Sequence, residues 1–227
     1  MMATQVELKQ TLINALEAND YETVRTLALQ SRKVFSVLVR LAYDKTTLIG
    51  WRSISAIGHV ASLYVKNNYD FLRDAIRKLL WSLSDESGGI GWSAPEILGE
   101  IVSADPGKMS DVIPLIADIF TLDERVFRPG VLYALKRISE TQPGSVVQFK
   151  GLAMCGLTEN DPLARIYALE LVHVLKEQFS PEDLKKVISQ VENLKEDEAV
   201  TWVYRNDSFE DLEVKEIAKI VYNNLLK

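Results

Sequence analysis

The sequence has little of what disulfide-linked, metal-binding and nucleic-acid-binding proteins depend on. Its 227 residues include one cysteine and two histidines. An intrachain disulfide framework is therefore excluded, and a zinc site of Cys and His ligands is not expected. Acidic residues outnumber basic ones, 32 to 26, for a formal net charge of −6 at pH 7. Because nucleic-acid-binding proteins usually carry a basic surface, we do not expect a nucleic-acid partner.

Long hydrophobic runs are also missing. No apolar stretch approaches the ~20 residues that cross a bilayer, and residues 1–7 lack the basic start and apolar segment of a signal peptide. We therefore expect a cytoplasmic protein without membrane contact. Cys155 lies in the apolar stretch 152–157, which favours a buried, unreactive thiol.

What the sequence does have is helical periodicity. Strand signals are nearly absent, and apolar residues recur at three- and four-residue spacing almost throughout. The pattern predicts helices near residues 4–16, 19–28, 34–41, 47–64, 69–83, 93–103, 112–120, 123–141, 146–155, 161–174, 180–194 and 208–226. Expected helix starts are the capping boxes Thr4/Glu7, Asn19/Glu22, Ser93/Glu96 and Ser208/Asp211 and the pairs Asp161-Pro162 and Ser180-Pro181.

Four of these segments are copies of one another. Residues 51–60, 92–101, 129–138 and 163–172 superimpose, and recur about every 34–41 residues. Gly58 and Gly99 occupy equivalent positions, where helices must approach closely, whereas copies three and four have Lys136 and Glu170 there. One helix pair cannot cover its own apolar side, so successive pairs are expected to stack and share a core.

The form Trp-Arg-x-x-x-Ala-Ile-Gly at residues 51–58, supported by Ile97-Leu98-Gly99, resembles the HEAT-like repeat family, including the short type found in bilin-lyase-like proteins. The resemblance covers about residues 46–178, and the stretch 85–100 is similar to an uncharacterised prokaryotic group of such proteins. The resemblance to HEAT-like repeats implies an all-α fold. The expected architecture is an α-α superhelix of HEAT-like or armadillo-like repeats, whose concave surface holds a protein partner. We expect residues 1–227 to form a single domain with helical caps at both ends.

The loop at residues 84–92 is the best candidate for a binding edge. Its stretch Ser-Gly-Gly-Ile-Gly could cradle a phosphate ahead of a helix, but no Lys-Ser/Thr follows, and Asp85 and Glu86 would repel an anion. A turn between helices is the favoured alternative. The candidate binding residues are Asp85, Glu86, Gly88, Gly89, Trp92 and Glu96.

Other chemistry-bearing residues favour structural roles. Glu96 and Glu100, four apart, could do acid–base work or hold a divalent cation, but a cap and a solvated face are favoured. Glu170-x-x-His173 has the spacing of a di-metal bundle without the second copy that such sites need. Core packing is expected of Trp51, Trp81, Trp92 and Trp202. Acidic residues are interleaved along the same helices, so we do not expect the basic residues to form a continuous basic stripe. These basic residues are Arg52, Arg73, Arg77, Lys78, Arg125, Arg128 and Arg137.

The sequence therefore predicts a non-enzymatic protein-interaction or scaffolding module, with no catalytic residue, metal or cofactor. The alternative is an enzyme built on HEAT-like repeats. A DNA-alkylation-repair glycosylase would need a positive concavity lined by tryptophan and a carboxylate, and a bilin-lyase-like protein would need a pigment-sized groove.

Overall fold

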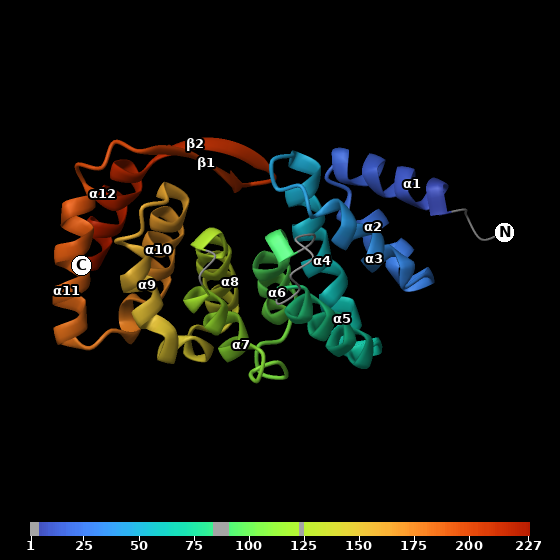
Figure 1. Ribbon diagram of the computed structural model, residues 1–227, viewed down its shortest axis with the longest axis horizontal. Coiled ribbons are helices and arrows are strands. Elements are labelled where there is room, and N and C mark those ends of the chain that lie inside the picture. Colours follow the sequence, from blue (N-terminus) through green and yellow to red (C-terminus); the bar gives the residue numbers. More distant parts are fainter. Residues whose placement is uncertain (1–4, 84–90, 123–124) are drawn as a thin grey trace.

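The computed structural model describes residues 5–83, 91–122 and 125–227. Within these ranges the chain is mostly helical, and one β-hairpin interrupts the helices (Figure 1). The helices are α1 (Gln5–Glu17), α2 (Tyr21–Gln30), α3 (Lys33–Leu41), α4 (Leu48–Asn67), α5 (Tyr69–Ser82), α6 (Ala94–Ser103), α7 (Ile113–Asp118), α8 (Arg128–Thr141), α9 (Lys150–Gly156), α10 (Pro162–Val174), α11 (Pro181–Leu194) and α12 (Val214–Leu225). Short 3₁₀ turns lie at Gly91–Ser93, Ile119–Thr121, Arg125–Phe127, Pro143–Ser145, Val147–Phe149 and Lys176–Gln178.

The helices form an α-α superhelix of helical repeats, as the sequence predicts. α4 packs on α6, α6 on α8, α8 on α10 and α10 on α12, so these helices make one continuous row. α5, α7 and α9 each pack between successive members of that row, and α1, α2 and α3 cover α4 at the N-terminal end (Figure 1). The four superimposed sequence segments fall on α4, α6, α8 and α10, which confirms the repeat.

The row is held together by the apolar faces that the periodicity predicted. Ile57 on α4, Ile97 on α6, Leu132 on α8 and Ile166 on α10 are completely buried, and each such side chain contributes roughly 1.5–3 kcal/mol by leaving water. The predicted close approach at Gly99 is confirmed, because a Cβ there would lie 2.5 Å from the Cα of Ala134. No helix in the described part of the chain is long and apolar enough to cross a bilayer.

Helix starts were predicted with mixed success. The side chains of Asp161 and Ser180 accept hydrogen bonds from the first-turn amides of α10 and α11, as expected. The cap of α2 is Asp20 rather than Asn19, whose φ of 54° places it in the turn before the helix. The Ser93/Glu96 capping box is wrong: the Ser93 hydroxyl instead donates to the Ala42 carbonyl oxygen over 2.6 Å.

The predicted helix start at Ser208/Asp211 is also wrong, because this region forms an antiparallel hairpin of β1 (Val200–Arg205) and β2 (Ser208–Glu213). Asn206 and Asp207 make its two-residue turn with φ of 49° and 60°, the left-handed conformation that Asn and Asp tolerate best after Gly. The hairpin leaves the α12 end and extends along one edge of the helix row toward the N-terminal helices (Figure 1).

Two expectations about side-chain burial fail. Cys155 is exposed rather than buried. On the short helix α9 it does not share the buried face that Ala153 and Gly156 form. Of the four tryptophans only Trp51 is a core residue; Trp81, Trp92 and Trp202 are 68%, 50% and 53% exposed. An apolar neighbourhood in sequence therefore did not indicate which side of each element faces the core.

Candidate functional site

A groove of about 840 Å³ is lined by residues of α4, α6 and α8. α2 contributes Tyr21 at one end, and the hairpin turn contributes Asn206 and Asp207. Most of the side chains along it are polar. We call this cavity the inner groove.

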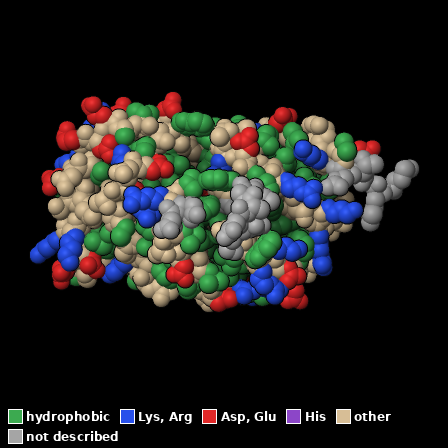
Figure 2. Space-filling model, in the orientation of Figure 1, with side chains coloured by type: hydrophobic (Ala, Val, Ile, Leu, Met, Phe, Trp, Pro, Cys, Tyr) green, Lys and Arg blue, Asp and Glu red, His purple; other side chains and the backbone are tan. Residues whose placement is uncertain are grey.

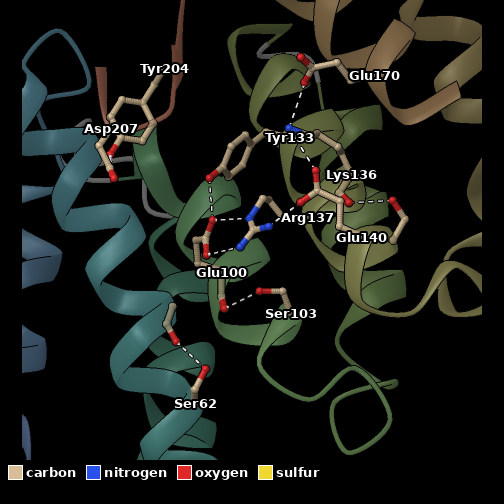
Figure 3. Close-up of polar contacts among 12 residues, drawn as sticks. Ser62, Glu100, Ser103, Tyr133, Lys136, Arg137, Glu140, Glu170, Tyr204 and Asp207 are labelled. Carbon is tan, nitrogen blue, oxygen red and sulfur yellow. Dashed lines mark hydrogen bonds and ion pairs between the residues drawn. The ribbon is translucent and has the colours of Figure 1, made fainter. Parts of the chain in front are cut away.

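A chain of alternating charges runs along the groove from Glu100 on α6 to Glu170 on α10 (Figure 3), and continues to the hairpin. Glu100 pairs with Arg137 through Nε, and Nη1 of the same guanidinium group contacts Glu140. Glu140 also pairs with Lys136, which bonds Glu170 on α10 over 3.1 Å. Glu170 completes the chain by pairing with Arg205 on β1. Three carboxylates therefore meet three cations, and the network has no net charge.

Glu100 is the most deeply buried member of this network, at 4% exposure. Its Oε1 accepts hydrogen bonds from the Tyr133 hydroxyl at 2.6 Å and from Arg137 Nε at 2.7 Å, and its Oε2 accepts a longer bond from Arg137 Nη2 at 3.3 Å. The lack of a side chain at Gly58 makes room for it, because a Cβ there would collide with the Glu100 carboxylate. A buried carboxylate is stable here because positive and hydrogen-bonding groups surround it.

Burial shapes the protonation of the network. It raises the pKa of Tyr133 well above its usual value, and the Glu100 charge adds to this effect. Burial lowers the pKa of Lys136, partly offset by the Glu140 carboxylate. Burial also acts to lower the pKa of Arg137, but the charge and hydrogen bonds of Glu100, together with Tyr133 and Glu140, outweigh it and raise this pKa above its usual value.

The hairpin turn is tied to the N-terminal helices. Asp207 Oδ1 accepts hydrogen bonds from the Tyr21 hydroxyl at 2.7 Å and the Tyr204 hydroxyl at 2.8 Å. The Asp207 carbonyl oxygen accepts from Arg52 Nη2 at 3.0 Å, while Arg52 Nη1 donates to the carbonyls that end α1. Trp51 stacks on Tyr204, with ring centroids 5.3 Å apart. The Trp-Arg pair of the first repeat therefore anchors the hairpin across the groove.

His59 on α4 lines the same groove. Its ring stacks on Tyr21 with centroids 4.6 Å apart, and its side chain is solvent-exposed. Partial burial against the groove wall lowers the pKa of His59, and the positive charge of Arg25 lowers it further, against the opposing charges of Glu100 and Asp207. The imidazole is therefore a neutral hydrogen-bonding group at physiological pH.

Of the six predicted binding residues, the structure describes Trp92 and Glu96. Asp85, Glu86, Gly88 and Gly89 lie outside the described residues, so the binding edge at 84–92 stays a prediction. Trp92 is half-exposed, and its ring lies 6.1 Å from that of Phe127.

Glu96 is not a surface cap but a buried residue, 2% exposed, bonded to Lys45. Glu96 and Glu100 share a helix but line different cavities.

Other candidate groups are engaged in structural pairs. Glu170 of the Glu-x-x-His pattern bonds Lys136 and Arg205, and in the described part of the chain no three His, Cys, Asp or Glu side chains are placed to hold a metal ion. Two arginines of the suggested basic stripe also have carboxylate partners on other elements: Arg73 bonds Asp111, and Arg128 bonds Glu159.

Sequence reasoning missed two parts of the groove. The first is the charged network. Lys136 and Glu170 replace glycine at equivalent positions of adjacent repeats, and their opposite charges could have indicated an ion pair between those repeats. The hairpin also left a signal: a β-branched and aromatic run at residues 200–204 precedes Asn206-Asp207, a pair compatible with a tight left-handed turn.

The fold and groove define a helical-repeat protein. No family model and no curated protein matches the sequence. Among solved structures, an engineered protein from the Northeast Structural Genomics Consortium is similar over 96% of both chains, with a TM-score of 0.53 and 14% identity. An archaeal HEAT-like repeats protein from Thermococcus onnurineus NA1 matches over 96% of both chains, with a TM-score of 0.42 and 13% identity.

Proposed function

We propose that this chain is a non-enzymatic interaction module that holds a segment of a partner protein in the inner groove. The observation that carries the proposal is the balance of charge along the groove. Lys136, Arg137 and Arg205 line it together with Glu100, Glu140 and Asp207, three charges of each sign. A polypeptide segment offers backbone donors and acceptors and mixed side chains, which suit a neutral, polar surface of this kind.

The same balance disfavours the glycosylase alternative. A protein that holds DNA neutralises phosphates with an excess of Lys and Arg, and the groove has no such excess. On the face shown in Figure 2, positive and negative side chains are likewise interspersed, with hydrophobic side chains exposed between them. These features support a protein partner over a nucleic acid.

A small-molecule ligand is the second candidate, because the volume of the groove is within the ~300–1,000 Å³ of typical ligand sites. Such sites are mostly apolar with a few polar groups, whereas Tyr21, Ser55, Ser62, Ser103 and the charged network make this one mostly polar. The lining therefore favours a polypeptide over a pigment.

The test fills the groove without breaking its network. Ser62 is exposed on the groove wall, and its hydroxyl bonds only the Gly58 carbonyl of its own helix. Ser62→Arg places a long side chain in the groove. Thr11 on α1 is a matched control, since its hydroxyl makes the same bond, to the Glu7 carbonyl, away from the groove. Partner proteins are recovered from a lysate of the source organism with each variant as bait and identified by mass spectrometry.

We expect wild type and Thr11→Arg to recover the same partner and Ser62→Arg to lose it, with equal thermal stability of all three. Equal recovery by Ser62→Arg would exclude the groove as the binding surface. A gel-shift assay with duplex DNA tests the glycosylase alternative, and retardation that Ser62→Arg changes would contradict the proposal.

A further inference from the structure

A second, smaller cavity of about 260 Å³ lies beside the hairpin, near the first turns of α6, α8 and α10. It is separate from the inner groove: Trp51 lines this cavity, whereas Tyr204, which stacks on Trp51, lines the groove. Its charged lining residues are Lys45, Glu96 and Asp161. We call it the rim cavity.

The Glu96 carboxylate is only half-satisfied. The side chain is 3% exposed, and its Oε1 accepts a hydrogen bond from Lys45 Nζ at 2.7 Å. Its Oε2 is buried and has no hydrogen-bond partner among the described residues. The carboxylate lies against Gly130, where a Cβ would be 2.7 Å from Glu96 Cδ. An ionised carboxylate has about four acceptor positions, so this buried oxygen would gain most from a further positively charged donor.

The charge of the cavity wall also favours a cation. Two carboxylates, Glu96 and Asp161, face one ammonium group, that of Lys45. Asp161 uses Oδ1 to cap α10 through the Leu163 amide. Burial raises the pKa of Tyr167, and the charges of Glu96 and Asp161 raise it further. The two carboxylates therefore act on the same buried region.

Aromatic rings form the remaining wall. Trp51, Trp202 and Phe209 line the cavity, and the rings of Trp202 and Phe209 meet edge to face with centroids 5.4 Å apart. Trp202 is half-exposed, and Trp51 is buried. Aromatic faces attract ammonium and guanidinium groups, most strongly when the cation is partly desolvated.

We propose that the rim cavity binds one alkylammonium or guanidinium group, with the charge directed to Glu96 and the apolar stem against Trp51 and Trp202. The volume is below the range of drug-sized sites, which suits the end of a single lysine or arginine side chain. A partner polypeptide and a free amine both carry this chemistry. The proposal does not depend on the inner groove, and the experiment below distinguishes the two sources.

The experiment uses the full-length protein labelled with 5-fluorotryptophan, whose four tryptophans each report a fluorine signal. Single Trp→Phe variants assign the signals. The probes are n-butylammonium chloride and the peptide acetyl-Gly-Lys-Gly-amide, both protonated at neutral pH. The neutral probe n-pentanol carries no charge on an alkyl chain one carbon longer than that of n-butylammonium, and sodium chloride keeps the ionic strength constant.

We expect both cationic probes to shift the Trp51 and Trp202 signals saturably, and to leave Trp81, which does not line the cavity, unchanged. Pentanol should give no saturable shift. Glu96→Gln should weaken binding at least tenfold. Asp161→Asn removes a charge while keeping a good helix cap, and should weaken binding about threefold, on the order of a partly screened charge.

No saturable shift, or equal shifts with pentanol, would overturn the proposal. So would unchanged binding in Asp161→Asn, a variant that should fold even where Glu96→Gln does not. Binding of the peptide at least tenfold tighter than butylammonium supports a lysine of a partner protein as the occupant. Equal binding of the two supports a free amine.

Discussion

Removing the Glu100 carboxylate should be among the most damaging single changes to the inner groove. Glu100→Ala leaves the buried Tyr133 hydroxyl without its acceptor, 2.6 Å away in the wild type, which costs about 1–3 kcal/mol. The Arg137 side chain is about a third exposed and keeps its ion pair with Glu140. Loss of its ion pair with Glu100 therefore lowers the free energy of unfolding by a further ~1 kcal/mol or less. The space left beside Gly58 adds about 1 kcal/mol. We therefore expect a loss of about 3 kcal/mol in the free energy of unfolding.

Urea unfolding followed by far-ultraviolet circular dichroism measures this loss. Glu140→Gln is the matched control, because Glu140 also pairs with Arg137 but is 34% exposed, and its loss should cost below about 1 kcal/mol. In a double-mutant cycle, Tyr133→Phe should recover about 1 kcal/mol of the Glu100→Ala loss, since no unpaired hydroxyl remains. If Glu100→Ala costs no more than Glu140→Gln, the carboxylate does not hold the groove together and the reasoning from burial is refuted.

Three further predictions concern the groove, the hairpin and a helix cap. His59 has a lowered pKa in the folded state, so the unfolded chain binds more protons than the folded chain below about pH 6.5. The wild type should therefore lose stability relative to His59→Gln as pH falls from about 7.5 to about 5. Parallel curves of unfolding free energy against pH, measured by urea titration, would contradict this. Asp207→Gly keeps the turn conformation but removes the hydrogen-bond acceptor for the Tyr21 and Tyr204 hydroxyls. It should lower the free energy of unfolding by about 1–2 kcal/mol and speed amide hydrogen exchange in the hairpin. The control Asp207→Asn should change little. Asp161→Ala should lower stability by about 1 kcal/mol and Asp161→Asn by a few tenths, as measured by urea unfolding, and equal losses would exclude the capping role.

Much of the helical architecture could be predicted because its causes are local. Apolar residues at three- and four-residue spacing specify a helix with one buried face wherever they occur, and the predicted helix at 69–83 is observed as α5, Tyr69–Ser82. The repeat was visible because each copy must solve the same packing problem. Gly99 shows this, since its missing side chain is what allows α6 to approach α8.

The candidate site could be predicted only in fragments. Glu96 was identified as a notable residue, but as a surface cap, because nothing near it in sequence shows that Lys45, 51 positions earlier, bonds it. The hairpin was missed because its strands alternate weakly and its charged residues match a helix start equally well. Its stability depends on Tyr21 and Arg52, more than 150 positions away.

The sequence by itself determined that this chain is a stack of helical repeats, because periodicity and small residues at close contacts act within a few turns of helix. Only the tertiary structure decided what the stack presents to a ligand. Stacking brings Glu100 to Arg137 and Lys136 to Glu170 from neighbouring repeats, and it lets the hairpin turn reach α2 and α4. These pairings depend on the offset and rotation between successive repeats, which the sequence pattern leaves unspecified because the same apolar faces can pack at more than one angle.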